Sequence, residues 1–422
     1  MKTTNLPLHL TSLVAFLIPA FALWIRTGPS YGAALLLLGT LCFMLRWIKI
    51  RPASGTWALA IVLLGMAVLW FELTTQQGFH RWDRPIKWAL GALCIFFAAA
   101  YPPRPNAFFY GLPVGCIGMG ALAFWQVFGQ GMERATGYTS AIPWGDTALV
   151  LACFTGVYAA VFWKEKSWSW RLLQIFSVIA GLSASLLSQA RGGWIALAPV
   201  LLMFLFIGWQ MRSHLFRPLA GLLCGLLIVF LLIIGVTPSL RAHVEKAVTE
   251  VSQFYQDHKV GTSLGIRLEQ YRLALEVIPE KPLLGWSRKG FVAETERRVA
   301  LGDFDPAIIE FKDFIHNEIL DSWAKTGIPG VLMQLAIYAV PIFLFWPSRK
   351  RLSHLKIQEE WQQALCLRLM GCLMGVMYLS FGMTMPYFAH NSGTVFFIFC
   401  LICLWSALQG LDRKPNDQVM NP

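Results

Sequence analysis

The chain has 422 residues, of which 56% are hydrophobic and only 14% are charged, and it contains 18 Trp and 30 Phe. This composition excludes a soluble protein with a single core. It also excludes a disordered chain, which needs low hydrophobicity and high charge density to escape collapse. The formal net charge of +12 leaves a nucleic-acid partner to be considered until the basic residues are placed along the chain.

The apolar residues form runs long enough for a helix, rising ~1.5 Å per residue, to cross a hydrocarbon core about 30 Å thick. We therefore predict an all-α integral membrane protein with about twelve transmembrane helices. In chain order they are expected near residues 8–25, 31–48, 56–75, 86–101, 107–129, 143–163, 168–187, 193–210, 217–236, 328–346, 363–385 and 391–409.

The basic residues are distributed unevenly between the predicted loops. If both chain ends lie in the cytoplasm, about 16 Lys and Arg fall in cytoplasmic segments, against about 6 in the short loops on the opposite side. Cytoplasmic loops of membrane proteins carry such an excess, so the bias predicts the orientation. The net charge is then explained by topology, and no nucleic-acid partner is expected.

One connection is much longer than the others, and it divides the chain into three predicted parts. Residues 1–236 hold transmembrane helices one to nine, and residues 328–422 hold helices ten to twelve and a cytoplasmic tail. Between them, residues 237–327 form a large loop that carries the candidate catalytic residues. The charge bias places this loop in the periplasm.

Three helices are predicted within the large loop. Apolar residues at helical spacing predict an amphipathic helix over 263–278, and a charged helix is expected over 290–300. The third is expected to begin at Asp305-Pro306, an N-cap followed by a first-turn proline, and to end at Gly327. The two amphipathic helices among them would lie at the membrane surface, with their polar flanks facing a cleft.

Three arginines are predicted to bind a phosphate group. Arg191 stands in the brief break between two predicted spans, followed by Gly192 and Gly193, which would let the backbone approach a ligand closely. Arg267 and Arg272 flank the apolar seam of the first loop helix. A guanidinium holds phosphate through two parallel hydrogen bonds, so these residues predict an anion site on one face of the membrane.

His316 is the candidate general base. Asp313 lies one helical turn before it and Lys312 four residues before it, so a carboxylate would orient the ring while a cation keeps it neutral. Asn317 and His390 are supporting candidates. If the environment leaves its pKa unperturbed, the histidine should lose its activity as the pH falls through about 6.5.

No metal site and no cofactor are predicted. Asp303-Phe304-Asp305 has the Asp-x-Asp form by which many transferases hold a divalent cation, but Asp305 is better explained as the cap of the following helix. The sequence contains no phosphate-binding P-loop and no dinucleotide fingerprint.

Together, several short motifs resemble the O-antigen ligase family, which belongs to a larger group with O-antigen polymerases and protein O-oligosaccharyltransferases. The likeness spans most of the chain and includes the single large outer loop. Its motifs are His316 followed by ten residues and Gly327, the Arg191-Gly-Gly-Trp-Ile195 break, and Pro282-Leu-Leu-Gly285. In the second motif the family's pattern has leucine where this chain has Ile195.

The resemblance implies a metal-independent, inverting glycosyltransferase of the membrane-embedded class C type. It would act at the periplasmic face of a Gram-negative inner membrane. Its donor would be undecaprenyl-pyrophosphate-linked O-antigen, and its acceptor the lipid A-core oligosaccharide. In this scheme His316 takes the proton of the acceptor hydroxyl, and Arg191, Arg267 and Arg272 neutralise the pyrophosphate.

Two alternatives stay open. An O-antigen polymerase or a protein O-oligosaccharyltransferase of the same group would use similar chemistry, although such polymerases tend to have two sizeable outer loops. From another class, a secondary transporter would explain the number of spans. Transporters usually have their long loop between related halves, whereas here it follows the ninth predicted span.

Overall fold

The computed structural model describes residues 6–75, 82–211, 221, 225 and 238–413, and within these ranges the regular structure is helical. The helices of the first half are α1 (Leu6–Phe21), α2 (Gly28–Cys42), α3 (Met44–Trp47), α4 (Ser54–Thr75), α5 (Asp83–Ala100), α6 (Pro105–Phe124), η2 (Trp125–Gly129), α7 (Ala141–Val161), α8 (Trp168–Leu187), α9 (Arg191–Trp194) and α10 (Leu197–Met211). The helices of the second half are α12 (Pro238–Asp257), α13 (Ser263–Val277), α14 (Ser287–Ala300), η3 (Pro306–Phe311), α15 (Glu318–Phe345), α16 (Arg349–Leu352), α17 (Gln358–Gly382), η4 (Tyr387–Ala389) and α18 (Asn391–Asp412).

The predicted integral membrane protein is confirmed. Among the described residues, 8 helices are long and apolar enough to cross a membrane, and α1 and α2 are shorter apolar helices. The predicted span 86–101 corresponds to α5, whose first turns contain Asp83, Arg84 and Lys87. The predicted span 217–236 lies outside the described residues, apart from two single positions. The total of twelve spans therefore stays a prediction.

The centre of the bundle is formed by α7, α17 and α18. Between 83% and 89% of their spanning windows is buried inside the protein, whereas α8 is only 28% buried and lies at the edge. Their spanning windows are largely apolar and buried, as expected for helices surrounded by other helices. The second half of the chain thus supplies two of the three central helices.

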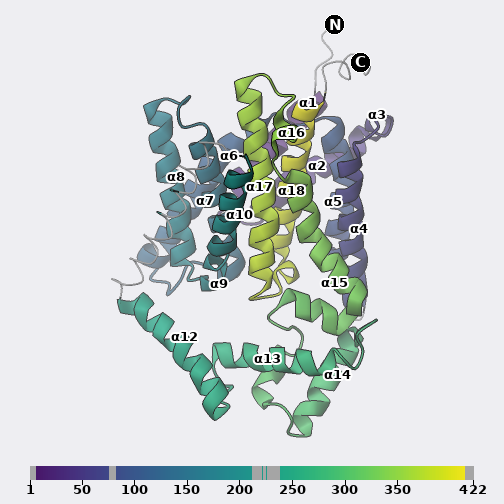
Figure 1. The fold of residues 1–422 in the computed structure, drawn as a ribbon, viewed down its shortest axis with the longest axis vertical. Helices are drawn as coiled ribbons and strands as arrows, with labels where there is room; N and C mark the ends of the chain where they lie inside the picture. The colour runs from purple at the N-terminus through teal and green to yellow at the C-terminus, as the bar shows by residue number, and fades with distance from the viewer. Residues whose placement is uncertain (1–5, 76–81, 212–220, 222–224, 226–237, 414–422) are drawn as a thin grey trace.

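Outside the bundle, α12, α13 and α14 lie across one end, while the start of α1 and the end of α18 lie at the other end (Figure 1). The predicted helices over 263–278 and 290–300 are confirmed as α13 and α14, whereas α12 had not been predicted. Arg298 joins α14 to α13 and the turn after it through ion pairs with Glu276 (3.2 Å) and Glu280, and it also pairs with Glu294 of its own helix (2.7 Å). The layer also has a small apolar core of its own, which includes Leu273, Val277, Phe291 and Ile308.

The third predicted loop helix, from Asp305 to Gly327, is wrong as a single element. Asp305 does cap a helix, since its side chain accepts a hydrogen bond from the amide of Ala307 (2.8 Å), but this 3-10 helix ends at Phe311. The chain is not helical again until Glu318, because the Asn317 side chain accepts the amides of the next turn and starts a new helix there.

As predicted, the helix that begins at Glu318 ends at Gly327, whose φ and ψ are non-helical, and after this kink a second helix continues α15 to Phe345. The φ of Gly327 is +67°, and a Cβ added to it would lie 2.2 Å from the carbonyl oxygen of Leu283. Gly285, also at φ +67°, faces the same kink, with Lys325 at 2.5 Å from an added Cβ. The Pro282-Leu-Leu-Gly285 motif therefore packs backbone against backbone on α15, which only glycine permits at these positions.

We expect Gly285→Ala to destabilise the protein more than Gly302→Ala. Gly302 also has positive φ (+85°), but an added Cβ would meet nothing within 4 Å, so its substitution carries only the conformational cost of about 1–2 kcal/mol. At Gly285 the clash with the α15 backbone is added to that cost. Thermal unfolding of the two variants in detergent measures the difference, and equal melting temperatures would contradict the proposed packing.

Candidate active site

Stretches that are far apart in the sequence meet at the end of the bundle covered by α13. The hydroxyl of Tyr271 on α13 lies within hydrogen-bond distance of two carbonyl oxygens, that of His316 (2.8 Å) and that of Met383 after α17 (3.0 Å). The next residue, Thr384, abuts Gly192 in the α9 turn, where an added Cβ would lie 2.6 Å from the threonine hydroxyl. Met383 and Thr384, two consecutive residues after α17, thus connect the α9 turn that carries Arg191 with the segment that carries His316.

The imidazole of His316 is held by Gln270 of α13. The side-chain oxygen of Gln270 lies 2.7 Å from His316 Nδ1 and 3.2 Å from the His316 amide nitrogen. The amide nitrogen of Gln270 donates to the carbonyl oxygens of Phe311 (3.1 Å) and Phe314 (2.8 Å). Because only the NH₂ group can serve two carbonyls, the oxygen must face the histidine and accept from Nδ1–H. This leaves Nε2 of His316 with a free lone pair.

His316 is half-buried and remains neutral at physiological pH. Its burial, and secondly the positive charge of Arg267, lower the pKa of His316 to about 4. The expected value near 6.5 is therefore corrected downward, because a protonated ring would lose solvation and face a cation. A neutral ring with a defined tautomer is the form that can accept a proton.

Arg267 lies on the same face of α13 as Gln270 and Tyr271, at helical spacings of three and four residues. It is half-buried, and its guanidinium makes no ion pair or hydrogen bond with the described part of the chain. Burial lowers the pKa of Arg267, but its ordinary value is so high that the group keeps its charge. A partly desolvated arginine without a counter-ion is suited to bind an anion.

Arg191 begins the short helix α9 and is exposed, and its side chain likewise has no ion pair within the described ranges. The two glycines that follow it were predicted to allow close approach of a ligand. Instead they allow close packing of helices, because an added Cβ on Gly193 would lie 2.0 Å from the carboxylate of Asp146 and one on Gly192 would meet Thr384. The backbone packing fixes the turn, and the guanidinium has no partner among the described residues.

Arg272 is bonded to other groups of the protein, and its predicted role in binding pyrophosphate stays a prediction. It pairs with Glu269 (2.9 Å), donates to the carbonyl oxygen of Asp303 (2.6 Å) and lies over the ring of Phe304. Five residues after Arg267, it points roughly 140° away around the helix. Its contacts tie α13 to the turn before η3.

Asp313 does not orient His316, contrary to the prediction. Its carboxylate forms an ion pair with Arg288 (2.7 Å), because residues 312–317 are not helical and the assumed one-turn spacing does not exist.

The two supporting candidates lie in different places. Asn317 is the N-cap of α15 and lies next to the base. His390 lies before α18, where burial and the positive charge of Arg84 on α5 lower its pKa. The structure therefore places His390 beside α5, where the adjacent Asn391 also bonds to Asp83 (2.8 Å).

Gln270 and Tyr271 were not predicted from the sequence as site residues. Their positions three and four residues after Arg267, which place them on the same helix face, were a signal that could have identified them. Sequence reasoning also missed Glu318, a buried acid two residues after His316. One oxygen of Glu318 accepts the amide of Phe388 (2.8 Å) and the other accepts the hydroxyl of Tyr338 (2.6 Å). These bonds anchor the start of α15 to the loop before α18, and so support the segment that carries the base.

Gln270→Leu should lower glycan transfer by up to about 10²-fold, because a base displaced by about 1 Å can lose that much rate. Leucine has a similar volume but can fix neither the tautomer nor the ring. Transfer by the purified variant measures the effect, with Gln256→Leu on the exposed part of α12 as the matched control. Unchanged transfer would show that Gln270 does not position the base.

The comparisons with known proteins match the segment that contains the candidate site. A family model described as O-Antigen ligase matches residues 176–335, a segment that contains Arg191, Arg267 and His316. Residues 176–335 form an O-antigen ligase family domain. The resemblance inferred from the motifs is therefore confirmed for this segment, and the family implies a lipid-linked glycan transferase activity.

A similar protein is found in Haemophilus influenzae, where it is described as an uncharacterized protein. It is 25% identical to this chain over 403 residues, which cover 94% of this chain and 98% of the relative. The similarity thus extends over the bundle as well as the O-antigen ligase domain.

Proposed function

We propose that the protein is an O-antigen ligase. It transfers O-antigen polysaccharide from undecaprenyl pyrophosphate to lipid A-core oligosaccharide at the periplasmic face of the Gram-negative inner membrane. The observation that carries this proposal is His316, held with Nε2 free by Gln270, next to a partly buried Arg267 that has no counter-ion among the described residues. Such a pair offers a base and an anion-binding group at one place.

In this proposal the arginines bind the donor. The bond between the anomeric carbon and the pyrophosphate oxygen breaks during transfer, and the departing pyrophosphate takes the electron pair. Arg267 and Arg191 stabilise that growing negative charge through paired hydrogen bonds. This role requires no metal ion, so transfer is expected to continue in excess EDTA.

His316 serves the acceptor. A sugar hydroxyl of the lipid A-core attacks the anomeric carbon from the face opposite the leaving group and inverts its configuration. The hydroxyl proton passes to Nε2 of His316, while Nδ1–H remains bonded to Gln270. The Gln270 contact would also stabilise the imidazolium that forms.

Donor binding should strengthen the base. In the free protein the charge of Arg267 lowers the pKa of His316, so neutralising that charge with pyrophosphate raises it again. The base then approaches the pKa range in which proton transfer at neutral pH is efficient. The enzyme would thus keep its histidine a weak base until the donor is present.

The dependence of transfer on pH tests this coupling. Protonation removes the lone pair on Nε2, so kcat/KM, which reports on the free protein, should fall as the pH drops through about 4. The fall in kcat, which reports on the donor complex, should occur at higher pH than the fall in kcat/KM. If both parameters fall at the same pH, coupling through Arg267 is contradicted.

Deletion of the gene followed by lipopolysaccharide analysis tests the function itself. A ligase mutant should retain complete lipid A-core, while long-chain O-antigen stays on its lipid carrier. Core that carries a single O-antigen repeat would instead identify a polymerase. Normal lipopolysaccharide would overturn the proposal and return attention to the protein O-oligosaccharyltransferase and transporter alternatives.

A further inference from the structure

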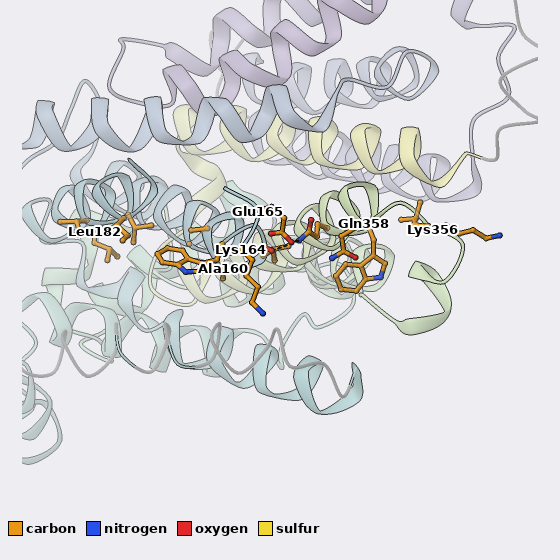
Figure 2. A pocket seen from close by; sticks show the side chains of 16 residues that line it. Ala160, Lys164, Glu165, Leu182, Lys356 and Gln358 are labelled. Atoms are coloured by element: carbon orange, nitrogen blue, oxygen red, sulfur yellow. Dashed lines mark hydrogen bonds between the residues drawn. The ribbon is translucent and has the colours of Figure 1, made fainter. Parts of the chain in front are cut away.

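A large groove lies at the end of the bundle opposite α13, between α7, α8 and the start of α17 (Figure 2). Its volume is about 800 Å³, which is within the range of ligand-binding pockets. It is far from the candidate active site, because α7 and α8 cross the whole bundle between the two ends (Figure 1). The groove is therefore independent of the proposed transfer reaction.

The interior of the groove is apolar. One wall is a stripe on α8 formed by Ile175, Val178, Ile179 and Leu182, which recur at helical spacing. The opposite wall is the end of α7, whose small residues, such as Gly156 and Ala160, leave the open space. Ile175 and Ile179 are 41% and 56% exposed, so the groove opens toward the hydrocarbon that surrounds the edge helix α8.

The outer edge of the groove is polar and carries two lysines. Lys164 and Lys356 are exposed, and their side chains extend outward from the apolar walls (Figure 2). The acidic residue at the rim, Glu165, accepts a hydrogen bond from Gln362 (2.8 Å). Arg171 lies beside this rim, with its guanidinium bonded to the carbonyl oxygen of Lys164 (3.2 Å). The cations outnumber the single carboxylate, so the rim is positively charged.

We propose that this groove binds an anionic phospholipid from the leaflet at this end of the bundle. Its acyl chains would lie between the α8 stripe and α7, and its phosphate would be held by Lys164 and Lys356. The positive charge of the loops at this end assigns the leaflet to the cytoplasmic side. Basic pockets between transmembrane helices on that side suit anionic headgroups.

Native mass spectrometry of the purified full chain tests the site, with phosphatidylglycerol and phosphatidylcholine as probes. The parent protein should retain phosphatidylglycerol in preference to phosphatidylcholine. The double variant Lys164→Glu, Lys356→Glu should weaken phosphatidylglycerol binding by on the order of tenfold or more. The double variant Lys164→Arg, Lys356→Arg should retain it, because the charges remain.

Two further variants separate this site from general attraction to the membrane. Lys49→Glu with Lys350→Glu makes the same change in net charge at positions that do not line the groove, and it should leave lipid binding intact. Ala160→Trp fills the apolar part and should remove both lipids. The proposal is overturned if the Lys164 and Lys356 reversals bind as the parent does. Unchanged lipid binding by Ala160→Trp would also overturn the proposal, because the groove would then be filled by the chain itself and not by lipid.

Discussion

His316→Ala is expected to lower the rate of glycan transfer by about 10²- to 10⁴-fold while donor binding is largely retained. The substitution removes the free Nε2, which is placed to accept the proton of the acceptor hydroxyl. It leaves Arg267 and Arg191, whose guanidiniums lie on other elements, in place. The loss should therefore appear in kcat and not in the affinity for the lipid-linked donor.

The measurement combines transfer to lipid A-core with direct binding of undecaprenyl-pyrophosphate-linked glycan. His258→Ala, at an exposed position of the same loop, is the matched control and should behave as the parent. Because the backbone of His316 also bonds to Gln270 and Tyr271, the thermal unfolding of each variant must be compared. Near-parent transfer by a folded His316→Ala protein would show that the base lies elsewhere.

Arg267→Lys and Arg191→Lys should each weaken donor binding by on the order of ten- to a hundredfold. Lysine keeps the charge but loses the planar fork that holds phosphate through two hydrogen bonds, and a hydrogen bond to a charged group contributes about 1.5–3 kcal/mol. Arg267 is expected to show the larger effect, since it is partly buried and less screened by water than the exposed Arg191.

Arg272→Lys supplies the decisive comparison, because it makes the same chemical change on the same helix. Its guanidinium is already bonded to Glu269 and to the carbonyl oxygen of Asp303, so the variant should lose stability and retain donor affinity. Equal losses of donor affinity at Arg267 and Arg272 would show that both arginines contact the pyrophosphate.

The sequence by itself determined the class of the protein and most of its spans. In hydrocarbon a helix satisfies every backbone polar group within its own segment, so an apolar run of about 20 residues indicates a spanning helix. Helix starts set by one side chain were also readable, as at Asp305, because such a cap is a contact between residues two or three apart. Arg191 was found as a cation between two apolar runs, whereas Arg267 and His316 were found as polar residues of the large loop.

Only the tertiary structure decided which of the candidates can act together. Arg267 and Arg272 look alike in the sequence, yet one is without a counter-ion in the described chain and the other is bound by Glu269, Asp303 and Phe304. The partner of His316 is Gln270, 46 residues earlier in the chain, and not the nearby Asp313. Helical periodicity constrains only neighbours within a turn or two, whereas hydrogen-bond partners and burial depend on how separate helices pack.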